Sequence, residues 1–114
     1  MLNKGEIWLA NLNPSRGTAP GKMRPVLIVQ DQALLETKHP STLIIPLTTA
    51  LIEGAAPLRL RITARDRLKQ DSDLLIDQIR AVDNKRLLEG PLTLLNEDIL
   101  KIVYKAVSEV MGMV

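Results

Sequence analysis

The 114-residue sequence contains no cysteine and no phenylalanine, and it has only one tryptophan, one tyrosine and one histidine. The lack of cysteine excludes disulfides, a thiol nucleophile and thiolate metal ligands. The single histidine excludes ribonuclease chemistry that uses two histidines, and His39 lies beside Pro40 in a polar stretch typical of a solvated loop. Because aromatic residues are so few, Leu, Ile and Val must supply nearly all of the core.

Long apolar runs and a strong excess of charge are also absent. No run approaches the roughly 18 residues that a membrane span needs, and no leader-like segment opens the chain. We therefore expect a soluble cytoplasmic protein with no membrane partner. The net charge of +2 and pI near 9.2 permit an anionic partner without identifying one. The length predicts one domain, residues 1–114, which is small enough that association with a second copy is expected.

Alternation of apolar and polar residues, or short apolar runs, predict several short strands. We expect them at residues 5–12, 24–30, 42–49, 58–62 and 74–82. Pro46 interrupts the third of these and suggests a bulge or an edge position, since proline cannot donate a ladder hydrogen bond. The connections at residues 13–23, 53–57 and 65–73 read as loops or turns, and Gly90 and Pro91 read as a further break.

Two helices are predicted, a short one at residues 31–36 and a longer one near the C-terminus. Asn96 is the expected N-cap of a helix from Glu97 to about Met111. Its apolar residues fall on one face at helical spacing: Ile99, Ile102, Val103, Ala106, Val107 and Val110. The predicted fold class is mainly β (α+β), a small curled antiparallel sheet or SH3-like barrel with a C-terminal helix.

Metal and nucleotide sites find little support in the sequence. Magnesium usually recruits one or two carboxylates that converge on one point. The aspartates here are scattered, with arginines between them: Asp66, Asp71, Asp73, Asp77 and Asp83. The segment GKMRP follows neither the phosphate-loop nor the dinucleotide spacing. We therefore expect no metal and no cofactor.

Phosphate chemistry by arginine, threonine and a carboxylate remains open. RNA can be cleaved by its own 2′-hydroxyl, so the protein must orient that group and stabilise charge on the phosphoryl oxygens. Arg24, Thr48 and Thr49 offer suitable donors. The simpler alternatives are that Arg24 is a solvated strand-end charge, that the threonines are ordinary strand residues, and that Asp77 and Arg80 form a cross-strand surface pair.

Four segments decide between these interpretations: GEIWLANLNPSRG, GKMRPVLIVQ, LIIPLTTALI and LLIDQIRAVDNKRL. In this order and spacing they resemble the MazF/PemK (Kid) toxin endoribonucleases of type II toxin–antitoxin systems, from about Lys4 to the C-terminal helix. The resemblance implies a small barrel-like sheet with a C-terminal helix, a homodimer, and metal-independent cleavage of single-stranded RNA at short sequences. It also implies 2′,3′-cyclic phosphate and 5′-hydroxyl ends, and a cognate antitoxin whose extended acidic segment covers the RNA site.

The resemblance also assigns residues. Arg24 matches the arginine that contacts the scissile phosphate as acid or charge stabiliser, and Thr48 matches the threonine placed against the same phosphate. Asp77 lies where some members carry an acid–base residue. The resemblance and donor chemistry place the following residues along the RNA: Asn13, Arg16, Thr18, Lys22, Thr49, Gln78 and Arg80.

One departure from the family pattern concerns the expected general base. Many members read Gly-x-Glu-x-x-Gly after the first strand, and here Ala19 occupies the position of that glutamate, while Thr18 replaces a histidine found in some members. Alanine cannot move a proton, so assistance worth about 10²–10⁴-fold would be lost. Either another base such as Asp77 acts, or Ala19 is an introduced change that disarms a toxic nuclease. We favour the second explanation, because an active ribonuclease is hard to express.

Two other functions compete with RNA cleavage. A toxin of the same barrel type with a protein target, such as a gyrase poison, would not need the phosphate-binding pair of Arg24 and Thr48. A non-catalytic SH3-like binding module would rely on aromatic platforms, and this chain has too few aromatic residues. With so little stacking available, RNA recognition is expected to depend on polar contacts and arginine, and Trp8 is expected to be structural.

Overall fold

The computed structural model describes residues 1–12 and 23–113. Its elements follow one another along the chain as β1 (Glu6–Asn11), β2 (Met23–Ile28), α1 (Gln32–Glu36), β3 (Ser41–Thr48), β4 (Arg59–Ile62), β5 (Ser72–Leu75), the 3₁₀ turn η1 (Ile76–Gln78), β6 (Arg80–Asp83), the 3₁₀ turn η2 (Asn84–Arg86), β7 (Leu87–Leu94) and α2 (Glu97–Val110). The loop predicted at residues 13–23 lies almost wholly outside the described residues.

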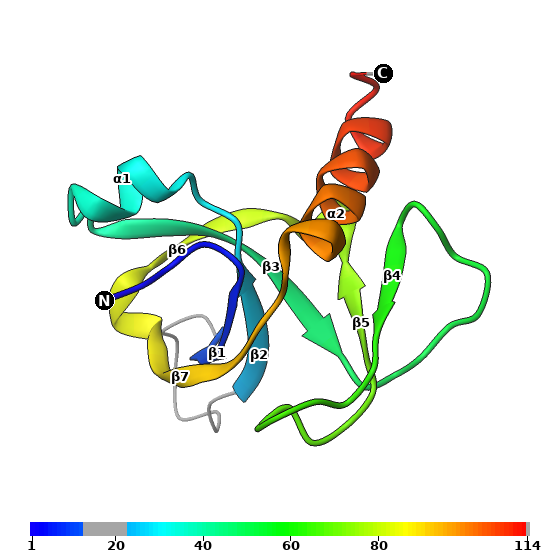
Figure 1. The fold of residues 1–114 in the computed structure, drawn as a ribbon, viewed down its shortest axis with the longest axis horizontal. Helices are drawn as coiled ribbons and strands as arrows, with labels where there is room; N and C mark the ends of the chain where they lie inside the picture. The colour runs from blue at the N-terminus through cyan, green and yellow to red at the C-terminus, as the bar shows by residue number, and fades with distance from the viewer. Residues whose placement is uncertain (13–22, 114) are drawn as a thin grey trace, which may run out of the picture.

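The strands form one antiparallel seven-stranded sheet with the order β4-β5-β3-β2-β1-β7, and β6 pairs with β3. Figure 1 shows the sheet curling around β3, with β1, β2, β6 and β7 on one side and β4 and β5 on the other. Within the described residues no pairing joins β4 to β7, so the sheet is not a closed barrel. The predicted curled antiparallel sheet with a C-terminal helix is confirmed.

Strand β3 is the centre of the sheet, and Pro46 lies where it changes partner. Residues Ser41–Ile44 pair with β6, whereas Leu47 and Thr48 pair with β5. Pro46 falls between these two paired segments and lies opposite Val26 of β2. Of the two predicted alternatives, a bulge or an edge position, the edge position is wrong, because β3 has partner strands on both sides. A missing donor is tolerated here because neither β5 nor β6 pairs with this residue.

The predicted strand at residues 74–82 is two strands separated by a 3₁₀ turn, because β5 ends at Leu75 and β6 begins at Arg80. Gly90 and Pro91, where a break is predicted, lie within β7. The pairing with β1 is irregular there, because Ile7 pairs with Thr93 and Leu9 pairs with Glu89, so the predicted break is an irregularity inside a strand and not the end of one. Gly90 packs against the face of Trp8, where an added Cβ would lie 2.5 Å from the ring. The missing side chain thus allows close packing inside a strand, and Trp8 serves the fold as predicted.

Helix α2 covers one face of the sheet, with Asn96 as the predicted N-cap, its side chain accepting a hydrogen bond from Ile99 N at 2.9 Å. Its buried residues are Leu100, Val103 and Ala106, whereas Ile102 is 58% exposed and does not belong to the buried face. A second apolar cluster lies on the other face, built from Ala10, Val26, Ile28, Leu35, Ile44 and Val82. No described helix is long and apolar enough to cross a membrane.

Candidate phosphate-binding site

Arg24 and Thr48 lie at the ends of two neighbouring strands and line one cavity. The paired register of β2 and β3 ends at Val26 and Pro46, and Arg24 and Thr48 are each two residues away from these positions along their strands. On the other side of β2, Arg24 faces the fully buried Ala10 of β1. Small Ala10 and a strand end leave the guanidinium room to reach outward.

A shallow cavity of about 240 Å³ opens beside this pair. It is lined by Met23, Arg24, Pro25, Leu47, Thr48 and Thr49. Arg24 and Thr48 are half-buried and Thr49 is exposed. A second cavity, of about 420 Å³, shares Pro25 and Thr49 with the first, and its lining includes Arg67, Lys69 and Gln70. Glu89 also lines it and forms an ion pair with Arg67 at 2.7 Å. The two cavities are therefore neighbours.

Thr48 has a defined local role besides its place in the cavity. Its Oγ1 accepts a hydrogen bond from Ala50 N at 3.2 Å. A threonine hydroxyl has one hydrogen to donate, and no acceptor for it is found among residues 1–12 and 23–113. The Ala50 contact therefore fixes the oxygen and leaves the O–H available to a ligand in the cavity.

The other predicted residues do not line this cavity. Asp77 and Gln78 lie exposed on η1, and Arg80 lies exposed on β6 opposite Ile44, which is about 13 Å along β3 from Thr48. Asp77 is in a turn and not in a strand, so the alternative of a cross-strand pair with Arg80 is wrong. Five further predicted residues, Asn13, Arg16, Thr18, Ala19 and Lys22, lie outside the described residues.

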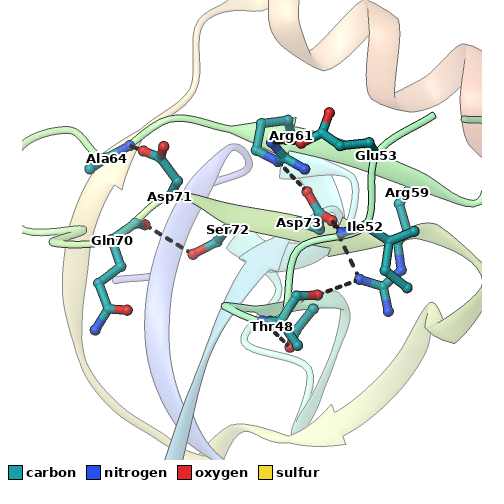
Figure 2. Close-up of polar contacts among 11 residues, drawn as sticks. Thr48, Ile52, Glu53, Arg59, Arg61, Ala64, Gln70, Asp71, Ser72 and Asp73 are labelled. Atoms are coloured by element: carbon teal, nitrogen blue, oxygen red, sulfur yellow. Dashed lines mark hydrogen bonds and ion pairs between the residues drawn. The ribbon is translucent and has the colours of Figure 1, made fainter. Parts of the chain in front are cut away.

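A buried ionic cluster next to Thr48 escaped sequence analysis. Asp73 of β5 lies directly opposite Thr48 and also directly opposite Arg61 of β4. Its side chain is 1% exposed, and it accepts hydrogen bonds from Arg61 Nε at 2.6 Å, Ile52 N at 3.0 Å and Arg59 Nη1 at 3.4 Å. Figure 2 shows the Asp73 carboxylate between the two arginines, above Thr48. The sequence offered one signal, the alternating arginines of β4, which share a face and call for a counter-charge.

The cluster perturbs the titration of its members. Burial raises the pKa of Asp73, but the hydrogen bonds from Arg61, Ile52 N and Arg59 outweigh burial and bring that pKa below its ordinary value. Hydrogen bonds to Asp73 and then to Glu53 raise the pKa of Arg61. Both groups are therefore held in their charged forms at neutral pH.

We expect this cluster to make the fold sensitive to acid. Because the folded pKa of Asp73 is below the unfolded value of about 3.9, its stabilisation is complete above that value and is lost as the pH falls through the folded pKa. Asp73→Asn should lower the free energy of unfolding at pH 7 by about 1–3 kcal/mol and flatten its dependence on pH below 4. Urea unfolding at a series of pH values measures both effects.

Asp71→Asn is the matched control for that experiment, because Asp71 is exposed and accepts one backbone hydrogen bond, from Ala64 N at 2.7 Å. This variant should keep the acid-dependent stabilisation contributed by Asp73. An Asp73→Asn protein whose stability falls with acid as steeply as that of its parent would contradict the expectation.

Metal-binding side chains do not gather in the described part of the chain. No group of three or more His, Asp or Glu residues there is placed to hold an ion. The oxygens of the one deeply buried aspartate, Asp73, are already taken by two arginines and a backbone amide. The chemistry that this region offers is therefore that of arginine and hydroxyl donors.

Comparison with known proteins places this chain in a family. The profile described as "PemK-like, MazF-like toxin of type II toxin-antitoxin system" matches residues 3–111. A curated protein, Endoribonuclease MazF of Staphylococcus saprophyticus, is 34% identical over 115 aligned positions, which cover 99% of this chain and 93% of that protein.

Solved structures share the fold at lower sequence identity. The Mycobacterium tuberculosis toxin MazF-mt6 superposes with a TM-score of 0.77 and 19% identity, covering 96% of this chain and 98% of that chain. A chain of the MazE-MazF crystal structure (Form-II) from Deinococcus radiodurans gives a TM-score of 0.79 and 20% identity, covering 99% and 97%.

Proposed function

Because the chain belongs to the family of PemK-like, MazF-like toxins of type II toxin–antitoxin systems, we propose that it is an endoribonuclease that cuts single-stranded RNA at short sequences without a metal ion. The observation that carries this proposal is the pairing of a half-buried arginine and a half-buried threonine at one cavity, Arg24 and Thr48. Such a pair suits a phosphodiester, because the guanidinium can donate to two phosphate oxygens and the threonine hydroxyl can donate a further hydrogen bond to a non-bridging oxygen.

The reaction follows from these donors. The 2′-oxygen of the substrate attacks the adjacent phosphorus, the bond from phosphorus to the 5′-oxygen breaks, and the products carry a 2′,3′-cyclic phosphate and a 5′-hydroxyl. Arg24 stabilises the charge that develops on the phosphoryl oxygens. The departing 5′-oxygen takes up a proton, from Arg24 acting as an acid or from water, and becomes the 5′-hydroxyl. The Thr48 hydroxyl holds a non-bridging oxygen and so orients the phosphate for in-line attack.

The proton of the 2′-hydroxyl must leave to a base, and the chain has alanine at the position where the family resemblance expects that base. In this proposal Ala19 makes the chain a weakened form of the nuclease. Asp77 is the less favoured alternative, because it does not line the cavity of Arg24 and Thr48 within one chain.

The second cavity supports a polymeric substrate, and the family resemblance supports two protein partners. The second cavity, whose lining includes Arg67, Lys69 and Gln70, gives a neighbouring nucleotide a place beside the scissile phosphate. The family resemblance adds a homodimer and a cognate antitoxin that covers the RNA site. A structural relative is a complex described as an endoribonuclease with its cognate antitoxin, from a mycobacterial species.

The test is a cleavage assay on a mixed-sequence single-stranded RNA in buffer that contains EDTA. The protein is used both as it stands and with Ala19→Glu. We expect products whose 3′ ends resist ligation until the cyclic phosphate is opened and the phosphate is removed, and whose 5′ ends accept phosphate from a kinase. Cleavage that appears only after magnesium is added would contradict the mechanism. If neither form cuts RNA, a toxin with a protein target such as gyrase becomes the better assignment.

A further inference from the structure

We propose that Asp73 is a positioning residue of the RNA-cleaving site, which holds the segment 49–53 and, through it, the Thr48 hydroxyl. The inference rests on the proposed ribonuclease function and adds to it a residue that would touch neither the phosphate nor the reacting oxygens. It also makes segment 49–53 a determinant of which RNA sequence is cut.

The contacts of Asp73 reach this segment by two routes. Directly, its Oδ2 accepts a hydrogen bond from Ile52 N at 3.0 Å. Indirectly, Asp73 holds Arg59 at 3.4 Å, and the same Nη1 of Arg59 donates to the carbonyl oxygen of Ala50 at 2.8 Å. Arg61 donates from Nε to Asp73 at 2.6 Å and from Nη1 to Glu53 at 2.9 Å. Arg61 therefore links Asp73 to the far end of the segment. All of these interactions converge on one buried carboxylate (Figure 2).

The backbone of Ala50 links this network to the site. Its carbonyl is held by Arg59, and its N–H donates to Thr48 Oγ1 at 3.2 Å. A displacement of Ala50 therefore turns the Thr48 hydroxyl, and it also moves Thr49, which lines both cavities. Misplacement of a positioning group by about 1 Å can slow a reaction by roughly 100-fold.

Loss of the Asp73 charge should affect RNA binding and RNA cleavage differently, whereas simple loss of stability would lower both. Asp73 neutralises part of the charge of Arg59 and Arg61, and Arg61 has Glu53 as a second counter-charge. Asp73→Asn removes one negative charge from this cluster and leaves Arg59 without its carboxylate partner, so RNA should bind at least as tightly as before. Cleavage of the bound RNA should nevertheless be slower. A partly unfolded protein would instead lose binding and cleavage together.

The experiment compares Asp73→Asn with Asp71→Asn, both in the Ala19→Glu form. Asp71 is two residues away and also anchors a loop backbone N–H, but that N–H belongs to Ala64 and not to segment 49–53. Single-turnover cleavage and the Kd for an oligonucleotide with a 2′-deoxy substitution at the cut site are measured below the melting temperature of each variant. A pool of RNA sequences reports the cleavage preference.

We expect Asp73→Asn to lower the single-turnover rate constant by about 10- to 100-fold, to bind the uncleavable oligonucleotide as tightly as its parent or more tightly, and to cut a broader set of sequences. Amide exchange at Ile52 should become faster. Asp71→Asn should match the parent in all of these measurements. A folded Asp73→Asn protein with the rate and preference of its parent overturns the proposal, and so does an equal loss in Asp71→Asn.

Arg59→Met is the second variant and decides the question if Asp73→Asn fails to fold. It keeps an apolar stem at the edge strand β4 and removes the hydrogen bond to Ala50 O. Slower cleavage with an altered sequence preference supports the proposal, and unchanged cleavage overturns it. If the Ala19→Glu parent itself cuts no RNA, the ribonuclease assignment is at fault, and the positioning role falls with it.

Discussion

Replacing Ala19 by glutamate is expected to raise the rate constant for RNA cleavage by about 10²–10⁴-fold, the range that general-base assistance usually contributes. The reason is chemical. The 2′-oxygen is a poor nucleophile while it keeps its proton, and a carboxylate can take that proton as the bond to phosphorus forms. Arg24 and Thr48 can orient the phosphate and stabilise its charge, but neither is a base at neutral pH.

Single-turnover kinetics with a fluorescent oligonucleotide measure this gain. Ala19→Gln is the matched control, because glutamine has the shape of glutamate but cannot accept the proton, and it should remain as slow as the alanine form. If the glutamate and alanine forms cut at the same rate, position 19 is not that of the base. Asp77→Asn then tests the alternative, since loss of cleavage in that variant would assign the role to Asp77.

The second large effect is expected at Arg24. In the Ala19→Glu form, Arg24→Met should lower the cleavage rate constant by about 10²–10³-fold, as loss of one donor to a developing oxyanion commonly does. Arg24→Lys should recover only part of the rate, because an ammonium cannot bind two phosphoryl oxygens in a planar fork. The melting temperature should change little, since Arg24 lies at a strand end and is only half-buried.

Arg65→Met provides the control for loss of a positive charge. Arg65 lines a separate groove between β4 and α2, together with Ile99 and Ile102. We expect this variant to cleave RNA at the rate of its parent. If the Arg24→Met protein cleaved RNA as fast as the Arg65→Met protein, Arg24 would not be the residue that binds the scissile phosphate.

Sequence patterns predicted the strands and the helix in which buried and exposed residues recur at regular spacing. The strands around Ile7, Val26 and Leu60 alternate or form short apolar runs, and α2 begins at Glu97 after its Asn96 cap as expected. Prediction failed where neighbours in space override local chemistry. Gly90 belongs to a strand because Trp8 packs onto it, and Pro46 is tolerated in a central strand because β3 changes partner there.

The site was predictable in its residue types but not in its geometry. Arg24 and Thr48 were found by family resemblance, whereas their placement on one face requires the register between β2 and β3, which no local pattern specifies. Asp73 was assigned to a polar loop because Gln70 to Asp73 carries no apolar alternation. Its burial depends on two arginines, Arg59 and Arg61, that are brought to it by strand pairing.

The position of Asp73 along the chain has a consequence for synthesis on the ribosome. The aspartate follows Ile52 by 21 residues and Arg59 by 14, and chains emerge from their N-terminal end. A growing polypeptide therefore exposes Arg24 and Thr48 well before β5 exists to pair with β3. If Asp73 positions the site as proposed, a nascent chain cleaves RNA more slowly than the finished protein until that late pairing has occurred.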